Sequence, residues 1–290
     1  MTANVLQWVL SELAQQRRVA VATVLNTAGS VPGKTGARLA MSSSNKDWVG
    51  TVGGAGLEHR VLQRCRELLT EQRRPFAEVL TYGLNKGAKG YEVKPLDSLC
   101  GGRVSISIEV MIPMPHVHIM GGGHCGEALA MTLHSLGWSY SVHDTRPEFA
   151  SIEKYPHAIE RSSIAISDMF EGESASTMGR FSDVLLLGHD WAEDQERLLG
   201  LLTLFNLPGA TLNGQDYPRI GVIGSRSKWK SFEQTCRKQG LPQDLLDQVI
   251  CPIGLNIGAQ SPEEIAVAVV AQVMALHKGV DPNGSTWRQA

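Results

Sequence analysis

Six residues near the middle of the chain constrain its fold more than any others. The segment Gly121-Gly122-Gly123-His124-Cys125-Gly126 satisfies G-x-G-x-x-G, follows the short apolar stretch Val117–Met120 and precedes a helical pattern. In that setting Gly121 permits a tight turn, Gly123 lets a pyrophosphate approach the backbone, and Gly126, where the helix is predicted to begin, lets it pack on the strand. The segment therefore predicts the first strand–turn–helix unit of a dinucleotide-binding parallel sheet.

A carboxylate follows the next predicted strand, Ser139–His143. Asp144 comes 18 residues after Gly126, close to the usual spacing for a side chain that holds a ribose diol. Such a carboxylate favours a free 2′-hydroxyl, whereas Arg146 beside it could instead receive a 2′-phosphate. The alternative is that the glycines serve only helix–strand packing and that no nucleotide binds.

Strand and helix patterns continue to alternate through the rest of this half, which is typical of a parallel sheet covered by helices. The further elements are predicted over residues 184–187, 194–205, 220–223 and 262–278. The last helix opens with Ser261 and Glu264 in the arrangement of a capping box.

Three polar residues lie directly after predicted strands of this sheet. His189 follows one strand, and Ser225 and Arg226 follow another. Ligands of open α/β sheets lie beyond the carboxyl ends of the strands, so these side chains are expected to face the same crevice as the glycine turn. The alternative is that Ser225 caps a helix while Arg226 and Lys228 are solvated.

The first half of the chain has a different pattern. Its predicted elements are a helix over 5–15, a strand over 19–25, a helix that begins near residue 57 and an alternating strand over 103–112. Pro113 and Pro115 then stiffen the chain and cannot donate to a sheet. The sequence thus predicts an α/β protein with a mixed α/β domain over 1–112, a linker over 113–116 and a Rossmann-like parallel-sheet domain over 117–290.

Two glycine-rich loops of the first half are candidates for phosphate contact. One runs from Gly29 to Arg38 and includes Lys34, and the other contains Gly53 and Gly54 ahead of a predicted helix. Neither is a Walker motif.

Cys100 stands before Gly101 and Gly102 at the start of a predicted strand. Such a turn can form a nest of N–H groups that lowers the thiol pKa, and a thiolate there could ligate a soft metal or carry a persulfide. The alternative, which spacing alone favours, is a buried inert cysteine. The cysteines are Cys65, Cys100, Cys125, Cys236 and Cys251. With no Cys-x-x-Cys pair, they indicate neither a disulfide framework nor a zinc site.

Charge and hydropathy exclude several classes of partner. The formal net charge is −2, with no long run of one sign, so we expect binding neither to nucleic acid nor to an anionic membrane. No apolar run reaches the roughly 18 residues that a membrane span needs, and the first residues lack the pattern of a signal peptide. We therefore expect a cytoplasmic protein, with a homodimer as the default oligomer.

Taken in order, these segments resemble the XdhC/CoxI family, the accessory proteins of xanthine dehydrogenase and related molybdenum hydroxylases. In the first half the resemblance is carried by Thr27–Pro32, Gly36–Arg38, Gly50–Gly54 with Glu58, and Cys100–Gly102. In the second half it is carried by the glycine turn with Asp144 and Arg146, His189–Asp190 with Asp194, Ile220–Arg226 with Lys228, Pro252–Ala259 and Pro262–Ala266.

The resemblance implies a cofactor chaperone rather than an enzyme. Such a protein would bind the molybdenum cofactor, as molybdopterin or its dinucleotide form, while a cysteine desulfurase installs the terminal sulfur. It would then insert the cofactor into the molybdenum hydroxylase apoenzyme. The cofactor-binding cysteine of the family, which contacts the metal, maps onto Cys100, and Leu99 stands where relatives often carry a second cysteine.

Two alternatives remain open at this point. The glycine turn and Asp144, taken alone, would suit an NAD(P)-dependent oxidoreductase in which His189 acts as general acid. The Rossmann-like half could also be a docking platform whose nucleotide site stays empty.

Overall fold

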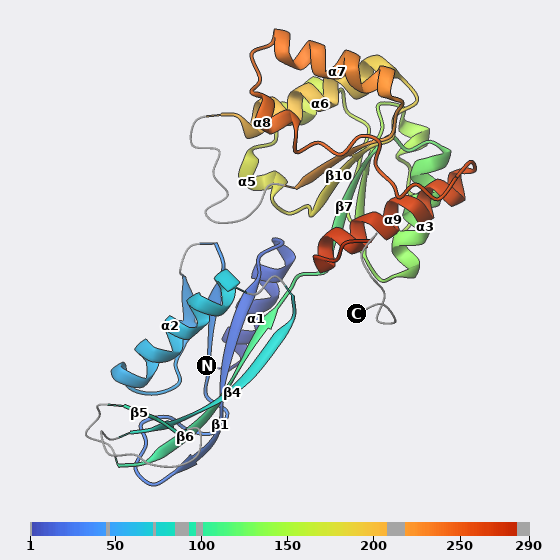
Figure 1. Ribbon diagram of the computed structural model, residues 1–290. Coiled ribbons are helices and arrows are strands. Elements are labelled where there is room, and N and C mark those ends of the chain that lie inside the picture. The colour runs from blue at the N-terminus through green and yellow to red at the C-terminus, as the bar shows by residue number, and fades with distance from the viewer. Residues whose placement is uncertain are drawn as a thin grey trace. The chain divides into compact units, whose positions relative to one another are not determined.

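The computed structural model divides the chain into two compact units (Figure 1). The described residues are 2–44, 47–71, 74–84, 93–96, 101–207 and 218–282. The first unit ends at Pro113 and the second begins at Met114, which lies within the stretch 113–116 predicted as a linker. No helix in these ranges is long and apolar enough to cross a membrane.

The first unit is a mixed sheet with two long helices. It contains α1 (Thr2–Ala14), β1 (Val19–Ala28), β2 (Arg38–Ser42), β3 (Trp48–Gly50), α2 (Ala55–Glu71), β4 (Phe76–Gly83), β5 (Val93–Pro95) and β6 (Arg103–Met111). The strand order is β3-β2-β1-β6-β4-β5, and every pair is antiparallel except β4 with β5. This confirms the predicted mixed α/β character of the first half.

Strand β1 is covered on both faces. Val19 and Val21 pack with α1 in one cluster, whereas Ala20, Ala22 and Val24 pack with α2 in another. Since successive side chains of a strand point to opposite faces, a strand covered on both sides reads as a continuous apolar run. This explains why the sequence shows no alternation at the start of β1.

A β-bulge interrupts the pairing of β1 with β6. Val24 pairs with Ile106, and Asn26 pairs with the adjacent Ser105, so Leu25 is the extra residue and its side chain is 47% exposed. The bulge lies just before the turn that leads from β1 toward β2.

The second unit is a parallel sheet between two layers of helices. It contains β7 (His116–Met120), α3 (His124–Ser135), β8 (Ser139–His143), the 3₁₀ turn η1 (Pro147–Phe149), β9 (Arg161–Ser162), α4 (Ile166–Glu171), α5 (Ala175–Met178), β10 (Asp183–Leu186), α6 (Trp191–Phe205), β11 (Arg219–Val222), α7 (Arg226–Lys238), α8 (Gln243–Leu246) and α9 (Pro262–Lys278). The order is β11-β10-β7-β8-β9, with all pairs parallel.

This order creates a crevice beside the central strand β7. The chain leaves β7 toward β8 and β9 on one side and returns to β10 and β11 on the other, so connections diverge between β7 and β10. Helices α3 and α9 cover one face, and α6 and α7 cover the other (Figure 1). The predicted Rossmann-like fold is thereby confirmed.

Two helix starts differ from their predicted positions. Helix α3 begins at His124 rather than Gly126, and α6 begins at Trp191 because the Asp190 carboxylate accepts hydrogen bonds from two first-turn N–H groups. The capping box of α9 is confirmed, since the Ser261 hydroxyl accepts from the Glu264 N–H.

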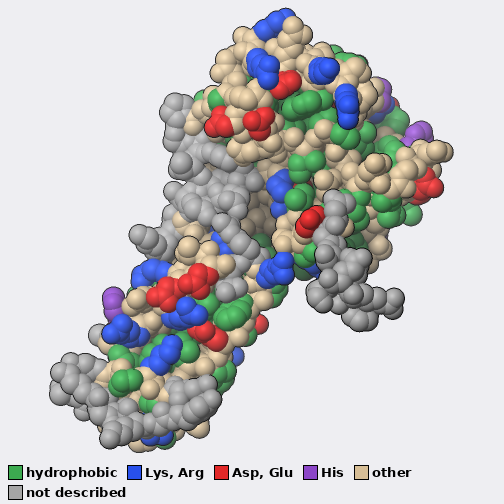
Figure 2. Space-filling view, in the orientation of Figure 1, with side chains coloured by type: hydrophobic (Ala, Val, Ile, Leu, Met, Phe, Trp, Pro, Cys, Tyr) green, Lys and Arg blue, Asp and Glu red, His purple; other side chains and the backbone are tan. Residues whose placement is uncertain are grey.

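Charges of both signs are interspersed on the surface. Figure 2 shows Lys and Arg side chains lying among Asp and Glu side chains on the visible face of each unit. This agrees with the near balance of 27 basic and 29 acidic residues.

Candidate functional site

Three glycine-rich segments converge in the first unit. Gly29 adopts φ +75°, and a Cβ placed on it would lie 3.1 Å from the Gly102 Cα. Gly53 adopts φ +102°, and a Cβ there would overlap Gly33. Glycine tolerates both the positive φ and the close approach. The loop after β1 is thus packed between the turn before α2 and the turn before β6.

The accessible part of this convergence consists of backbone groups and one basic side chain, that of Arg38. Gly101 is exposed, and nothing lies within 4 Å of the position its Cβ would take. The carbonyl of Arg38 accepts a 2.9 Å hydrogen bond from the Thr51 N–H, which ties the start of β2 to the second glycine segment. Among the described residues, the half-buried Arg38 guanidinium has no hydrogen-bond partner. It is therefore available to an anion.

The turn before α2 is held together from within. The Thr51 hydroxyl accepts a 3.1 Å hydrogen bond from the Gly53 N–H and donates to the Glu58 carboxylate. Gly54, with φ +65°, then leads directly into α2. Helix α2 thus starts at the convergence, and the N-terminal amides of a helix favour an anionic group.

Cys100, the predicted metal-contacting residue, lies outside the described residues. Its chain neighbours Gly101 and Gly102 are described, and Gly102 is buried, where a Cβ would lie 2.7 Å from the Ala28 carbonyl oxygen. The first unit therefore brings together Gly29, Gly53, Gly54, Gly101 and Gly102 among the predicted site residues.

In the second unit, the glycine turn packs as its motif predicts. A Cβ on Gly121, which adopts φ +117°, would lie 2.6 Å from the Gly188 nitrogen, and a Cβ on Gly126 would overlap the Gly121 carbonyl oxygen. Gly123 is the N-cap of α3, and nothing lies within 4 Å of the position that its Cβ would take. No side chain caps α3, so the amides of its first turn have no side-chain acceptor among the described residues.

The Asp144 carboxylate is bonded entirely within the protein. Its side chain is 1% exposed and accepts hydrogen bonds from the Gly122 N–H at 2.8 Å and from the Arg146 backbone N–H, Nε and Nη2 at 3.1, 2.8 and 2.9 Å. Burial favours the neutral carboxyl, but the Arg146 and Gly122 hydrogen bonds outweigh it and lower the pKa of Asp144. With four acceptor positions used, the predicted ribose contact finds no free acceptor.

Arg146 is in turn fixed by an aromatic ring. Its guanidinium carbon lies 3.8 Å from the centre of the Phe149 ring, and its side chain is 30% exposed. Ion pairing with Asp144 raises the pKa of Arg146, so it stays charged. Asp144 and Phe149 thus fix the position of the guanidinium.

A buried ionic network occupies the ends of β10 and β11. Asp194 and Arg197 are both fully buried, and their side chains are paired at 3.3 Å. The Lys228 ammonium group lies 2.8 Å from the same Asp194 carboxylate, and the Gly188 N–H donates to it at 3.1 Å. The interpretation of Lys228 as solvated is therefore wrong, because the side chain folds inward against Gly224.

The remaining predicted residues of this half lie at the surface. Ser225 caps α7 by accepting a hydrogen bond from the Lys228 N–H, which is the alternative that the sequence left open. His189 and Arg226 are exposed, and neither has a hydrogen-bond partner among the residues described.

Three residues of the crevice were missed by sequence reasoning: Arg197, Phe149 and Tyr155. The Tyr155 hydroxyl is buried without a hydrogen-bond partner among the residues described, 3.2 Å from where a Cβ on Gly122 would lie. No spacing rule indicates Tyr155, whereas Arg197 and Asp194 extend the apolar stripe of α6 backward at helical spacing.

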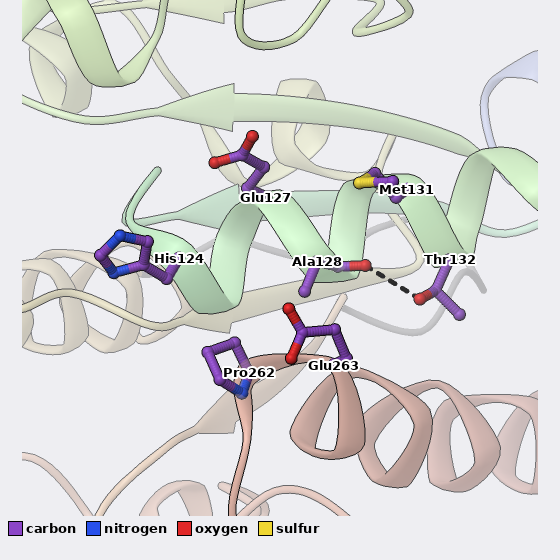
Figure 3. A pocket seen from close by; sticks show the side chains of 7 residues that line it. All are labelled: His124, Glu127, Ala128, Met131, Thr132, Pro262 and Glu263. Carbon is purple, nitrogen blue, oxygen red and sulfur yellow. Dashed lines mark hydrogen bonds between the residues drawn. The ribbon is translucent and has the colours of Figure 1, made fainter.

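A groove of about 450 Å³ runs between α3 and the first turn of α9 (Figure 3). It is lined by His124, Glu127, Ala128, Met131, Thr132, Pro262 and Glu263. His124 lies at the glycine-turn end of α3, and Glu263 lies opposite on α9 (Figure 3). Glu127 is paired with Lys154 at 3.0 Å, so it is not a free acid in this groove.

Two protein families match the sequence. The family described as the XdhC Rossmann domain matches residues 117–273. The family described as XdhC and CoxI matches residues 12–83. Between them the two matches include residues of both units.

Individual relatives match the chain at low sequence identity. The chain is 27% identical over 265 residues to the uncharacterized protein YqeB of Escherichia coli strain K12, covering 91% of this chain and 44% of that protein. It is 27% identical over 175 residues to a Bacillus subtilis strain 168 protein described as a probable subunit of xanthine dehydrogenase, covering 60% of this chain and 46% of that protein. The chain thus spans less than half the length of these relatives.

A solved structure also aligns along the chain. It is described as a xanthine dehydrogenase from Bacillus halodurans and has a TM-score of 0.46 at 20% identity, covering 97% of this chain and 98% of the other.

Proposed function

The chain belongs to the XdhC and CoxI family, and we propose that it is an accessory protein of a xanthine dehydrogenase-type molybdenum hydroxylase. In this role it binds the molybdenum cofactor, supports its sulfuration and inserts it into the apoenzyme. The observation that supports cofactor binding most directly is the convergence of Gly29, Gly53 and Gly102 beside the chain neighbours of Cys100.

Each part of the convergence has a proposed task. Backbone amides at Gly101 and at the start of α2, together with the Arg38 guanidinium, hold the phosphate of the pterin. The Cys100 thiolate contacts molybdenum or its terminal sulfur, since thiolates are soft ligands. The expected partners are the hydroxylase apoenzyme and a cysteine desulfurase, and a homodimer is the proposed oligomer.

Cofactor retention tests this proposal. The full chain is incubated with freshly released molybdenum cofactor, unbound material is removed by gel filtration, and molybdenum and pterin are assayed. We expect retention by the wild type, loss in Cys100→Ala, and unchanged retention in the control Cys251→Ala, whose half-buried thiol lies in the other unit. A wild type that retains no intact cofactor, or a Cys100→Ala variant that retains as much, contradicts the proposal.

Delivery requires a second measurement. Loaded protein is mixed with a purified molybdenum hydroxylase apoenzyme, and hydroxylase activity is followed with and without a cysteine desulfurase. We expect activity to rise faster than with an equal amount of free cofactor. If activity rises equally fast with loaded protein and with free cofactor, the protein stores the cofactor but does not deliver it.

The second candidate is an NAD(P)-dependent oxidoreductase, which is favoured by the uncapped start of α3 at Gly123. In that function the exposed His189 beyond β10 serves as general acid. Hydride transfer to carbonyl or hydroxy substrates that disappears in His189→Ala would favour this candidate over the chaperone.

A further inference from the structure

We propose that the outer face of α3 and α9 is the surface through which two copies of this chain associate, with α9 of one copy packed antiparallel on α9 of the other. The inference gives a surface to the homodimer proposed above and rests on that proposal, but it does not depend on cofactor binding. Three features carry it: an apolar helix face without a partner in its own unit, opposite charges at the two ends of that face, and a groove at one end.

Helix α9 is apolar on all sides. Between Ile265 and Leu276 its only polar side chain is that of Gln272, which accepts a 2.6 Å hydrogen bond from the Gly254 N–H. A helix at the surface of a protein ordinarily carries charged residues on the face that meets water, whereas a helix that is apolar all round is ordinarily buried. The sequence of α9 therefore suits a helix that is covered on both sides.

Only the inner side of α9 is covered within its unit. Val269 and Val273 are 1% exposed and pack in the core. On the outer side, Val267 is 53% exposed, and the half-buried Ala271 and Met274 follow it at helical spacing. This outer stripe lacks a covering element within the second unit.

Helix α3 extends the apolar face. The two helices lie side by side and run in the same direction (Figure 1), since His124 at the start of α3 lines one groove with Glu263 at the start of α9, and the ring of Trp138, which follows α3, lies 6.2 Å from the ring of His277 near the end of α9. Met131 of α3 is 69% exposed and lines the same groove (Figure 3). Exposed apolar faces with polar residues at their rim mark surfaces where proteins associate.

The two ends of the outer stripe carry opposite charges. Glu263 lies in the first turn of α9 and Lys278 is its last residue, about 22 Å further along the helix axis. Both side chains are exposed, and neither has an ion-pair partner among the described residues. In an antiparallel pair, Glu263 of each copy lies opposite Lys278 of the other, so the contact is complementary at both ends.

The middle of the stripe is a small residue. Ala271 stands about halfway between Glu263 and Lys278 in the sequence, so the two-fold axis of such a pair passes close to it. An alanine at the crossing point lets two helices approach to the lower end of the usual spacing of about 8 to 10 Å between their axes. Val267 of one copy then packs against Met274 of the other.

The groove at the start of α9 fits the lysine of the second copy. Its walls are apolar at Ala128, Met131 and Pro262, while Glu263 supplies a carboxylate (Figure 3). Lysine commonly lays its methylene chain along apolar surface and keeps its ammonium group at a polar one. In the antiparallel arrangement Lys278 of the second copy reaches this groove and fills a space that close-packed helices would not otherwise leave.

The symmetry of the charges favours a second copy over a different protein. A surface that pairs with itself across a two-fold axis must carry opposite charges at equal distances from that axis, as Glu263 and Lys278 do. Contact with a different protein would impose no such symmetry on the helix.

Sedimentation equilibrium of the full chain over a range of concentrations tests the inference. We expect a particle of twice the chain mass of 31.5 kDa. Val267→Lys places a charge in the apolar face, while Glu263 one turn earlier supports the helix, and it should weaken the dimer by roughly tenfold or more. The matched control is Val79→Lys, which alters a 61% exposed valine of β4 in the first unit and should leave the dimer unchanged.

Charge reversal tests the antiparallel arrangement. Glu263→Lys and Lys278→Glu each bring like charges together at both ends of the contact, so each should weaken the dimer by roughly tenfold. The double variant restores opposite charges and should recover most of the wild-type affinity. Lys238→Glu, which reverses the corresponding last residue of α7, is the control. Thermal melting followed by circular dichroism checks that each variant is folded.

Three results overturn the inference: a wild type that sediments as a 31.5 kDa monomer at every concentration, a Val267→Lys variant that dimerises as tightly as the wild type, and a double charge-reversal variant that dimerises no more tightly than the single ones. A monomeric wild type whose delivery to the hydroxylase is lost in Val267→Lys would assign the face to the apoenzyme instead. Cofactor retention by Val267→Lys, measured in parallel, separates failure of the dimer from failure of the chaperone proposal, which depends on Cys100.

Discussion

There is no room for a side chain at Gly188, because the Asp194 carboxylate occupies the place where a Cβ would lie. Asp194 in turn binds two cations, Arg197 and Lys228, at the end of β10. Buried charges are tolerated only when each is paired, so these residues depend on one another. One glycine thus maintains an arrangement of three charged groups.

We therefore expect Gly188→Ala to destabilise the second unit by about 3 kcal/mol, since breaking a buried ion pair leaves an uncompensated charge. Urea unfolding measures the change. The control is Gly172→Ala, where a Cβ would meet only ordinary contacts at 3.7 and 3.8 Å. If the two variants unfold at the same urea concentration, Asp194 has moved aside without loss.

Three buried histidines make the second unit sensitive to acid. Burial lowers the pKa of His116 to about 4, and it also lowers the pKa values of His118 and His143 below the ordinary value of 6.5. The folded protein therefore keeps these rings neutral at a pH where the unfolded chain protonates them. Their stabilising effect is complete above pH 6.5 and is lost as the pH falls below it.

The free energy of unfolding should accordingly fall between pH 7 and pH 5, by up to about 1.4 kcal/mol per pH unit for each histidine. In His118→Leu the slope should decrease by one such contribution, because this buried ring, stacked on Phe181, no longer titrates. Urea titrations at pH 5, 6 and 7 measure both slopes. If the free energy of unfolding of His118→Leu depends on pH as steeply as that of the wild type, His118 does not contribute to the pH dependence.

At the scale of single residues, the sequence predicted which residues lie at the site, but not the hydrogen bonds and ion pairs that they form. Gly121 and Gly126 follow from the motif, because steric crowding at such a turn is the same in every sheet of this kind. The pairing of Asp144 with Arg146 was not predictable, since it depends on how the chain turns through η1. Arg197 was missed because a charged residue in a helix is ordinarily solvated.

At the scale of elements, patterns with a clear period were predicted, whereas short strands and strands with few buried residues were not. Strand β6 alternates buried and partly exposed residues, as its sequence does. Strands β2, β3 and β5 have five, three and three residues, too few for a period, and β4 has only two buried residues at its end. Tertiary pairing, rather than local sequence, defines these strands.

The capping box of α9 gives a prediction for one element. Ser261→Ala removes the hydroxyl that accepts the Glu264 N–H, and we expect a loss of about 1 kcal/mol, the usual effect of removing a cap. Ser167→Ala, which alters an exposed hydroxyl on α4, is the control. Chemical denaturation of both variants checks the expectation, and equal stability would mean that water replaces the cap.

At the scale of the whole molecule, each unit has its own core. Two hydrophobic clusters contain only residues of the first unit, and two others contain only residues of the second. Units with separate cores can fold independently. The placement of Cys100 relative to these cores stays a prediction.

Scanning calorimetry should therefore resolve two unfolding transitions. Gly188→Ala, which lies in the second unit, should lower the temperature of one transition and leave the other within error. If both transitions shift together, or if only one transition exists, the units unfold as a single cooperative body.

The bulge at Leu25 bears on how this family can change in length. Val24 and Asn26 pair with neighbouring residues of β6, so loss of the Leu25 codon would leave every other pair of β1 and β6 in place. Loss of the Val21 codon would instead turn the following side chains of β1 to the opposite face. Natural length variation before the Gly29 turn is therefore expected to concentrate at a single codon.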